Sequence, residues 1–89
     1  MAKIKRDQIV FLEDIVDCID KIEAYMYGLS EIEFEKNSEK QDAVIRRIEI
    51  IGEAVKNISN EVKEKYPTIP WKEMAGMRDV LIHQYFGVT

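Results

Sequence analysis

Apolar residues recur every three or four positions through most of this chain, and that spacing constrains the fold more than any other sequence feature. Between Ile4 and Met26 they form a stripe along one helix face, widened by Phe11, Val16 and Tyr25. The stripe itself consists of Leu12, Ile15, Ile19, Ile22 and Met26. The strict alternation that a β-strand requires is absent, and so is any hairpin turn signal. The sequence therefore predicts an all-α fold.

A second long helix is predicted to start at Ser38, because Ser38 and Gln41 have the spacing of a capping box. The core stripe of this helix consists of Val44, Ile48, Ile51, Val55 and Ile58. Gly52 lies in its middle, where glycine costs about 1 kcal/mol relative to alanine. We therefore expect another backbone or a ligand to come close to Gly52.

Two shorter helices fill the connections. Ser30 and Glu33 form a capping-box pattern, so a short helix should follow Ser30 and carry Phe34 inward. Another short helix should begin at Ser59 or Asn60 and end before the first proline.

Pro70 fits the first position of a further helix, and a last helix is predicted from about Met77 to Phe86, with Gly87 as a possible stop. Residues 1–89 should therefore form one domain, an antiparallel bundle of four to five helices. A chain of 89 residues builds only a thin core, so a dimer is expected.

Charge and composition narrow the possible functions. The net charge of −4 argues against a broad basic surface for nucleic acid, although a local basic cleft needs only a few cations. The longest uninterrupted apolar run is Ile9 to Leu12, too short to span a membrane. The N-terminus lacks the pattern of a signal peptide, and the lone Cys18 reads as an inert core thiol, so we expect a cytoplasmic protein.

The segment RDVLIHQY places four reactive side chains on a helix that is otherwise mostly apolar. Asp79 and His83 are one turn apart on nearly the same face, and Arg78 shares a face with Tyr85. Arg78 and His83 are roughly 140° apart around an ideal helix, at about 100° per residue. A fixed cation suits an anionic transition state, and a histidine near neutral pH suits proton transfer. Ordinary salt bridges and caps would also explain these residues.

The same spacing has a counterpart in a known superfamily. Arg78, four residues, His83, one residue and Tyr85 match the signature of the HEPN superfamily, including the polar Asp79 directly after the arginine. The resemblance to its HepT toxin branch extends over most of the chain, and its most specific parts are IGEA, IPW and GMRDVLIHQY. Family members usually continue with more helix beyond the position of Val88. The resemblance therefore implies a bundle truncated at its C-terminal helix.

The resemblance implies a homodimer in which two copies of the motif face a shared cleft. It also implies a toxin that is a metal-independent endoribonuclease without a cofactor, acting through attack of the RNA 2′-hydroxyl. Arg78 and His83 would be catalytic, with Asp79 and Tyr85 in support. A cognate nucleotidyltransferase of the MNT type would be the antitoxin and would add adenylate to Tyr85 (AMPylation).

Other readings stay open at this point. Arg46, Glu49 and Glu53 form a charged row that is either a solvated face or a support for the motif, with Arg46 as an extra cation. Trp71 and Phe34 are predicted to be core or interface anchors rather than platforms for stacked bases. The whole protein could instead be a non-catalytic helical partner that binds a nucleotidyltransferase or a nucleotide. A plain dimerising bundle without a ligand is the third possibility.

Overall fold

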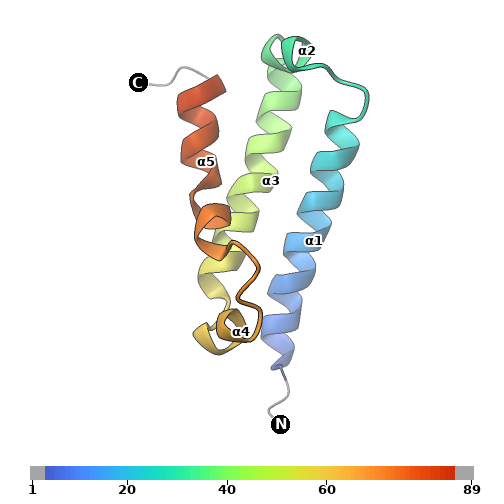
Figure 1. Cartoon of the computed structure of the whole chain (residues 1–89). Helices are drawn as coiled ribbons and strands as arrows, with labels where there is room; N and C mark the ends of the chain where they lie inside the picture. Colours follow the sequence, from blue (N-terminus) through green and yellow to red (C-terminus); the bar gives the residue numbers. More distant parts are fainter. Residues whose placement is uncertain (1–3, 86–89) are drawn as a thin grey trace.

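A computed structural model describes the backbone of residues 4–85 and the side chains of residues 4–84. Within that range the chain forms five helices and no strand, which confirms the predicted all-α fold (Figure 1). The helices are α1 (Arg6–Met26), α2 (Glu31–Glu35), α3 (Ser38–Asn57), α4 (Asn60–Lys65) and α5 (Trp71–Tyr85). No helix in this part of the chain has the length and apolarity to cross a bilayer.

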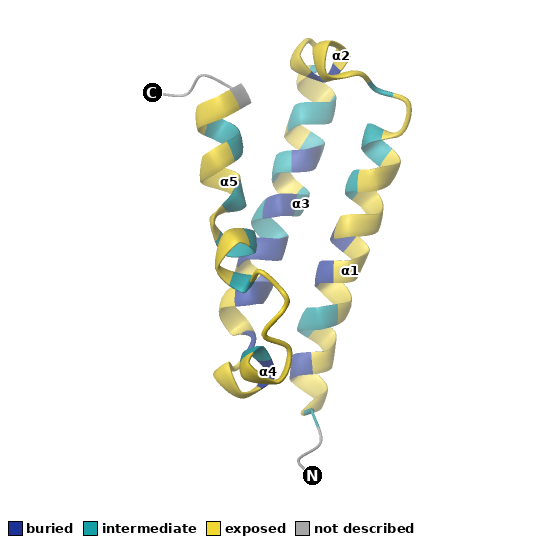
Figure 2. Ribbon diagram, viewed as in Figure 1, coloured by how far each residue is buried: buried dark blue, intermediate teal, exposed yellow. Residues whose placement is uncertain are grey.

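The long helix α3 lies between α1 and α5 and runs antiparallel to both of them (Figure 1). Both outer helices pack mainly on α3, so the molecule resembles a slab more than a closed bundle. Its dimensions are 49 × 26 × 19 Å and its radius of gyration is 14.7 Å. A compact domain of this length would have a radius of about 12 Å. The outer helices therefore leave much of their surface uncovered (Figure 2).

The core follows α3 along its whole length. Val44, Ile48, Ile51, Val55 and Ile58, the complete predicted stripe, are buried. Across from them, α1 contributes Ile15 and Cys18 to the main cluster of buried residues. Burial raises the pKa of the Cys18 thiol, because the thiolate would be poorly solvated there. The prediction of an inert core cysteine agrees with this environment.

The predicted stripe of α1 is wrong at two positions. Val16 is 57% exposed and Ile19 is 41% exposed, although the spacing placed both in the core. Ile15 and Cys18 occupy the side that faces α3, whereas Val16 and Ile19 lie on an adjoining side. Because α1 packs substantially against α3 alone, a second side of the helix stays uncovered.

The starts of α2 and α3 gave one correct prediction and one wrong one. Ser30 and Glu33 form the predicted capping box, and Phe34 is buried. At α3, however, the cap is Asn37, whose side-chain oxygen accepts a hydrogen bond from the Lys40 backbone N–H at 3.0 Å. The predicted partner Gln41 instead donates to the backbone carbonyls of the α2 end. Asparagine caps a helix as well as serine does, and here it comes one residue earlier.

The last helix begins earlier than predicted. Trp71 to Tyr85 form one continuous helix, so the separate start near Met77 is wrong. The carbonyl of Pro70 accepts the first helical hydrogen bond from Met74. Met74 and Ala75 then pack against the main core cluster, which keeps the chain helical through Gly76. The possible stop at Gly87 lies outside the described residues.

Candidate functional site

Arg78 lies on α5 about one turn beyond the point where that helix passes over Gly52 of α3. A Cβ atom added to Gly52 would lie 3.5 Å from the Ala75 carbonyl oxygen, so the α5 backbone passes directly over this glycine. That confirms the expected close approach at Gly52. It also brings the middle of α5 within side-chain reach of the charged row on α3.

One carboxylate on α3 holds the arginine of the motif. The Nε–H of Arg78 donates to Glu49 Oε2 at 2.9 Å. The other oxygen of that carboxylate lies 4.0 Å from Arg46 Nη1. The side chains of Arg78 and Glu49 are 47% and 36% exposed, so the pair is open to solvent on one side. Two arginines from different helices therefore share a single carboxylate.

A groove of about 320 Å³ surrounds this pair. Its charged lining residues are Arg46, Glu49, Glu53, Lys56 and Arg78. Three cations thus face two carboxylates, in a protein whose net charge is −4. Counted on these lining residues alone, the groove has one positive charge in excess, and the Asp79 carboxylate lies 3.7 Å from Arg78 just beside it.

Asp79 and His83 lie away from the floor of this groove. Asp79 Oδ1 is 3.7 Å from Arg78 Nη1, too long for a hydrogen bond, and its side chain is largely exposed. His83 is also exposed, and it is absent from the described lining of the groove. Tyr85 is the last residue of α5, but its side chain lies outside the described part. Among the predicted site residues, the structure thus brings Arg78 together with Arg46 and, more loosely, with Asp79.

The contact between Glu49 and Arg78 was not predicted from the sequence. The charged row on α3 could have been a solvated face, but Glu49 is half-buried and hydrogen-bonded to the motif. Arg46 and Glu53 do remain largely exposed. The sequence feature that could have indicated this contact is Gly52, one turn along the same helix, because the close approach expected there is made by α5.

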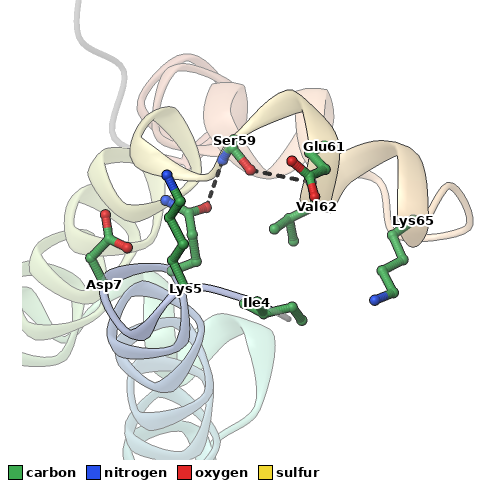
Figure 3. A pocket seen from close by; sticks show the side chains of 8 residues that line it. Ile4, Lys5, Asp7, Ser59, Glu61, Val62 and Lys65 are labelled. Carbon is green, nitrogen blue, oxygen red and sulfur yellow. Dashed lines mark hydrogen bonds between the residues drawn. The ribbon is translucent and has the colours of Figure 1, made fainter. Parts of the chain in front are cut away.

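A second pocket, of about 300 Å³, lies between the start of α1 and α4 (Figure 3). Lys5 and Lys65 line it, but Asp7 and Glu61 balance their charge. The buried Gln8 at its wall already has partners at both ends of its amide. Its Nε2–H donates to the Asn57 carbonyl oxygen at 3.0 Å, and its Oε1 accepts from the Ser59 backbone N–H at 2.7 Å. Gln8 thus connects α1 to the residues just before α4. The charges that line the pocket balance, so the pocket has no charge preference for a ligand.

No group of three or more His, Cys, Asp or Glu side chains within the described residues could hold a metal ion. The fold and the groove thus define a small helical protein with a groove between α3 and α5 in which three cations and two carboxylates meet.

Comparison with known proteins identifies the family to which this helical protein belongs. Residues 15–89 match the family described as "Ribonuclease HepT-like". The chain belongs to this family, as its resemblance to the HEPN superfamily indicated. No solved structure matches the chain.

Several relatives are about half identical to the chain. It is 54% identical to "Putative RNase MJ0125" of Methanocaldococcus jannaschii, over 94% of this chain and 72% of the relative. It is 51% identical to "Probable ribonuclease HepT" of Thermococcus cleftensis, over 94% of this chain and 76% of that protein. It is 52% identical to "Gamma-glutamylcyclotransferase and putative RNase MJ0434" of M. jannaschii, where 94% of this chain corresponds to only 38% of the relative.

Proposed function

We propose that this protein is an endoribonuclease whose active site lies at the α5 edge of the slab. The observation that carries the proposal is the groove that brings Arg46, Lys56 and Arg78 together, with Arg78 hydrogen-bonded to Glu49. Membership of the ribonuclease HepT-like family and the RNase names of its relatives support the same activity. These names specify RNA as the substrate, and the 2′-hydroxyl of RNA can act as the nucleophile without a metal ion.

In the proposed reaction the RNA 2′-oxygen attacks its own phosphorus while the bond from phosphorus to the 5′-oxygen breaks. A base takes the 2′-hydroxyl proton, and an acid protonates the departing 5′-oxygen, leaving a 2′,3′-cyclic phosphate. Arg78 stabilises the negative charge that builds on the phosphate. The reaction needs no metal ion for any of these steps.

The chain has only one histidine, whereas this reaction uses both a base and an acid. A dimer with facing α5 helices would supply two copies of His83, one for each role. It would also overcome the roughly 140° that separates Arg78 from His83 around one helix. Val80, 53% exposed between them, provides apolar surface for such a dimer. Asp79 would support His83, which lies one turn further along nearly the same helix face, and Arg46 would be an extra cation for the RNA backbone.

The proposed biological role is that of a toxin paired with an MNT-type nucleotidyltransferase antitoxin. The phenol oxygen of Tyr85 would attack the α-phosphate of ATP on the partner enzyme and release pyrophosphate. The added adenylate would place a phosphodiester next to Arg78, where the RNA phosphate should bind. Co-expression with the partner should add one adenylate to the peptide that contains Tyr85, and mass spectrometry of Tyr85→Phe should show none. Neutralisation of unmodified Tyr85→Phe would contradict this form of regulation.

The nuclease activity is tested with a defined RNA in the presence of EDTA. We expect cleavage to continue and the new 3′ ends to carry a 2′,3′-cyclic phosphate. An RNA whose 2′-hydroxyls are methylated should resist. Cleavage that requires added Mg²⁺, or that cuts the methylated RNA equally well, would contradict the mechanism.

A further inference from the structure

The groove contains a carboxylate where an anion should bind. Glu49 lies between Arg46 and Arg78, the two cations that the proposed function assigns to RNA phosphate. A negative charge in this place weakens phosphate binding, because like charges repel at short range. Either Glu49 has a benefit for catalysis that outweighs this cost, or it serves only as a structural ion pair between α3 and α5.

A purely structural role as an ion pair between α3 and α5 explains the position of Glu49 poorly. An ion pair with this much solvent exposure contributes about 0–1 kcal/mol to stability. Helix α5 is already attached to α3 by Met74 and Ala75 at one end of the contact and by Met77 and Leu81 further along. The pair is thus a minor part of the energy that holds the two helices together.

The geometry of the hydrogen bond gives a better explanation. Glu49 takes the Nε–H of Arg78, which is one edge of the planar guanidinium. A bond at that edge restrains the orientation of the plane. The edge formed by the two Nη atoms makes no hydrogen bond to Asp79, whose Oδ1 is 3.7 Å from Nη1, so an anion can bind there. Because Arg78 lines the groove, a phosphate entering the groove would meet an arginine whose side chain is already oriented.

We propose that Glu49 is a positioning residue that orients the guanidinium of Arg78 for a phosphate of the RNA substrate. This inference rests on the proposed ribonuclease function. Glu49 itself does not touch the substrate, and it acts only through Arg78. Its benefit is in the transition state, where the placement of the cation matters most, and its charge is a cost in the ground state.

This balance predicts an unusual kinetic signature for Glu49→Ala. The kcat should fall by about tenfold to a hundredfold, because a misplaced catalytic group has effects of that size. KM should stay the same or fall, because the groove loses a negative charge. In an Arg78→Lys background, which has no Nε–H to orient, Glu49→Ala should lower kcat by less than about twofold.

Two control variants separate positioning from charge and from stability. Glu53→Ala removes another carboxylate from the same groove, one that pairs with Lys56 and not with Arg78, so it should change KM more than kcat. Asp17→Ala removes an ion-paired carboxylate on α1, where Asp17 bonds Lys21 at 3.1 Å, and should leave both constants unchanged. Thermal unfolding of each variant checks that the fold is intact.

The experiment is steady-state cleavage of one fluorogenic RNA by the wild type and these variants. The expected result is a loss of kcat that is specific to Glu49→Ala and depends on Arg78. Wild-type kcat in Glu49→Ala, or an equal loss in Glu53→Ala, would overturn the positioning role while leaving the ribonuclease function intact. A wild-type protein that does not cleave RNA would overturn both.

Discussion

Helices α3 and α5 lie side by side in the slab, but they are built on different principles. Every residue of the α3 stripe is buried, and its sequence pattern predicts that buried face completely. Helix α5 has no fully buried residue among its described side chains, and its apolar residues face more than one direction. The difference separates two tasks, since α3 holds the domain together and α5 presents groups outward from it.

The largest effect expected from this comparison concerns stability. Ile51→Ala on α3 removes a side chain that is 1% exposed and should lower the free energy of unfolding by about 2–5 kcal/mol. In the monomer, at protein concentrations too low for the proposed dimer, Val80→Ala on α5 should change it by less than about 0.5 kcal/mol, because Val80 is 53% exposed in the single chain. Chemical denaturation measures both. Equal losses at the two positions would remove the distinction between the helices.

The second prediction concerns self-association. Val80→Lys should weaken the proposed dimer by about tenfold or more, because a lysine charge in an apolar interface must lose its water. Val16→Lys on α1 is the matched control, since Val16 is 57% exposed against 53% for Val80. Sedimentation over a range of concentrations distinguishes the two. If Val16→Lys alone dissociates the protein, the dimer uses the α1 side of the slab.

The start of α3 provides a smaller test. Asn37→Ala should cost about 1 kcal/mol of stability, since its side chain caps the helix at the Lys40 N–H. Ser38→Ala should leave stability unchanged or raise it by a few tenths of a kcal/mol, because Ser38 lies inside the first turn, where alanine is the better helix former. The reverse order of effects would restore the capping box predicted from the sequence.

The smallest effect concerns acid and the start of α2. Hydrogen bonds from the Ser30 backbone N–H and hydroxyl lower the pKa of Glu33 below its ordinary value. Because its pKa is lowered in the folded state, ionised Glu33 stabilises the fold. This stabilisation is fully present above the unfolded pKa and is lost as pH falls through the folded pKa. Glu33→Gln should therefore flatten the acid limb of the stability curve slightly. An identical acid limb in Glu33→Gln would show that the capping box contributes no pH dependence.

These contrasts also explain how far the sequence could predict the structure. The α3 stripe and the α2 cap follow from local spacing, because they depend on residues within one or two turns. The exposure of Val16 and Ile19 could not be predicted, because it depends on the absence of a covering element within the slab. An apolar residue at the right spacing looks the same in a core and in an uncovered face.

The site divides in the same way. Arg78 and His83 were identified by their spacing and by a family resemblance, and the structure then placed Arg78 in a groove with Arg46. The role of Glu49 depends on a contact between residues 29 positions apart, which no local pattern contains. Only the unfavourable glycine at Gly52 indicated that two helices would meet there.

His83 is the residue at which catalysis can be separated most cleanly from folding. His83 is exposed on α5, so His83→Ala should leave helicity and the thermal midpoint nearly unchanged. RNA cleavage should fall by roughly 10²–10⁴-fold, the range expected when a general acid or base is removed. Unfolding of His83→Ala would give this histidine a structural role. A folded His83→Ala protein that cleaves RNA at the wild-type rate would contradict the account that the α5 edge is a ribonuclease active site.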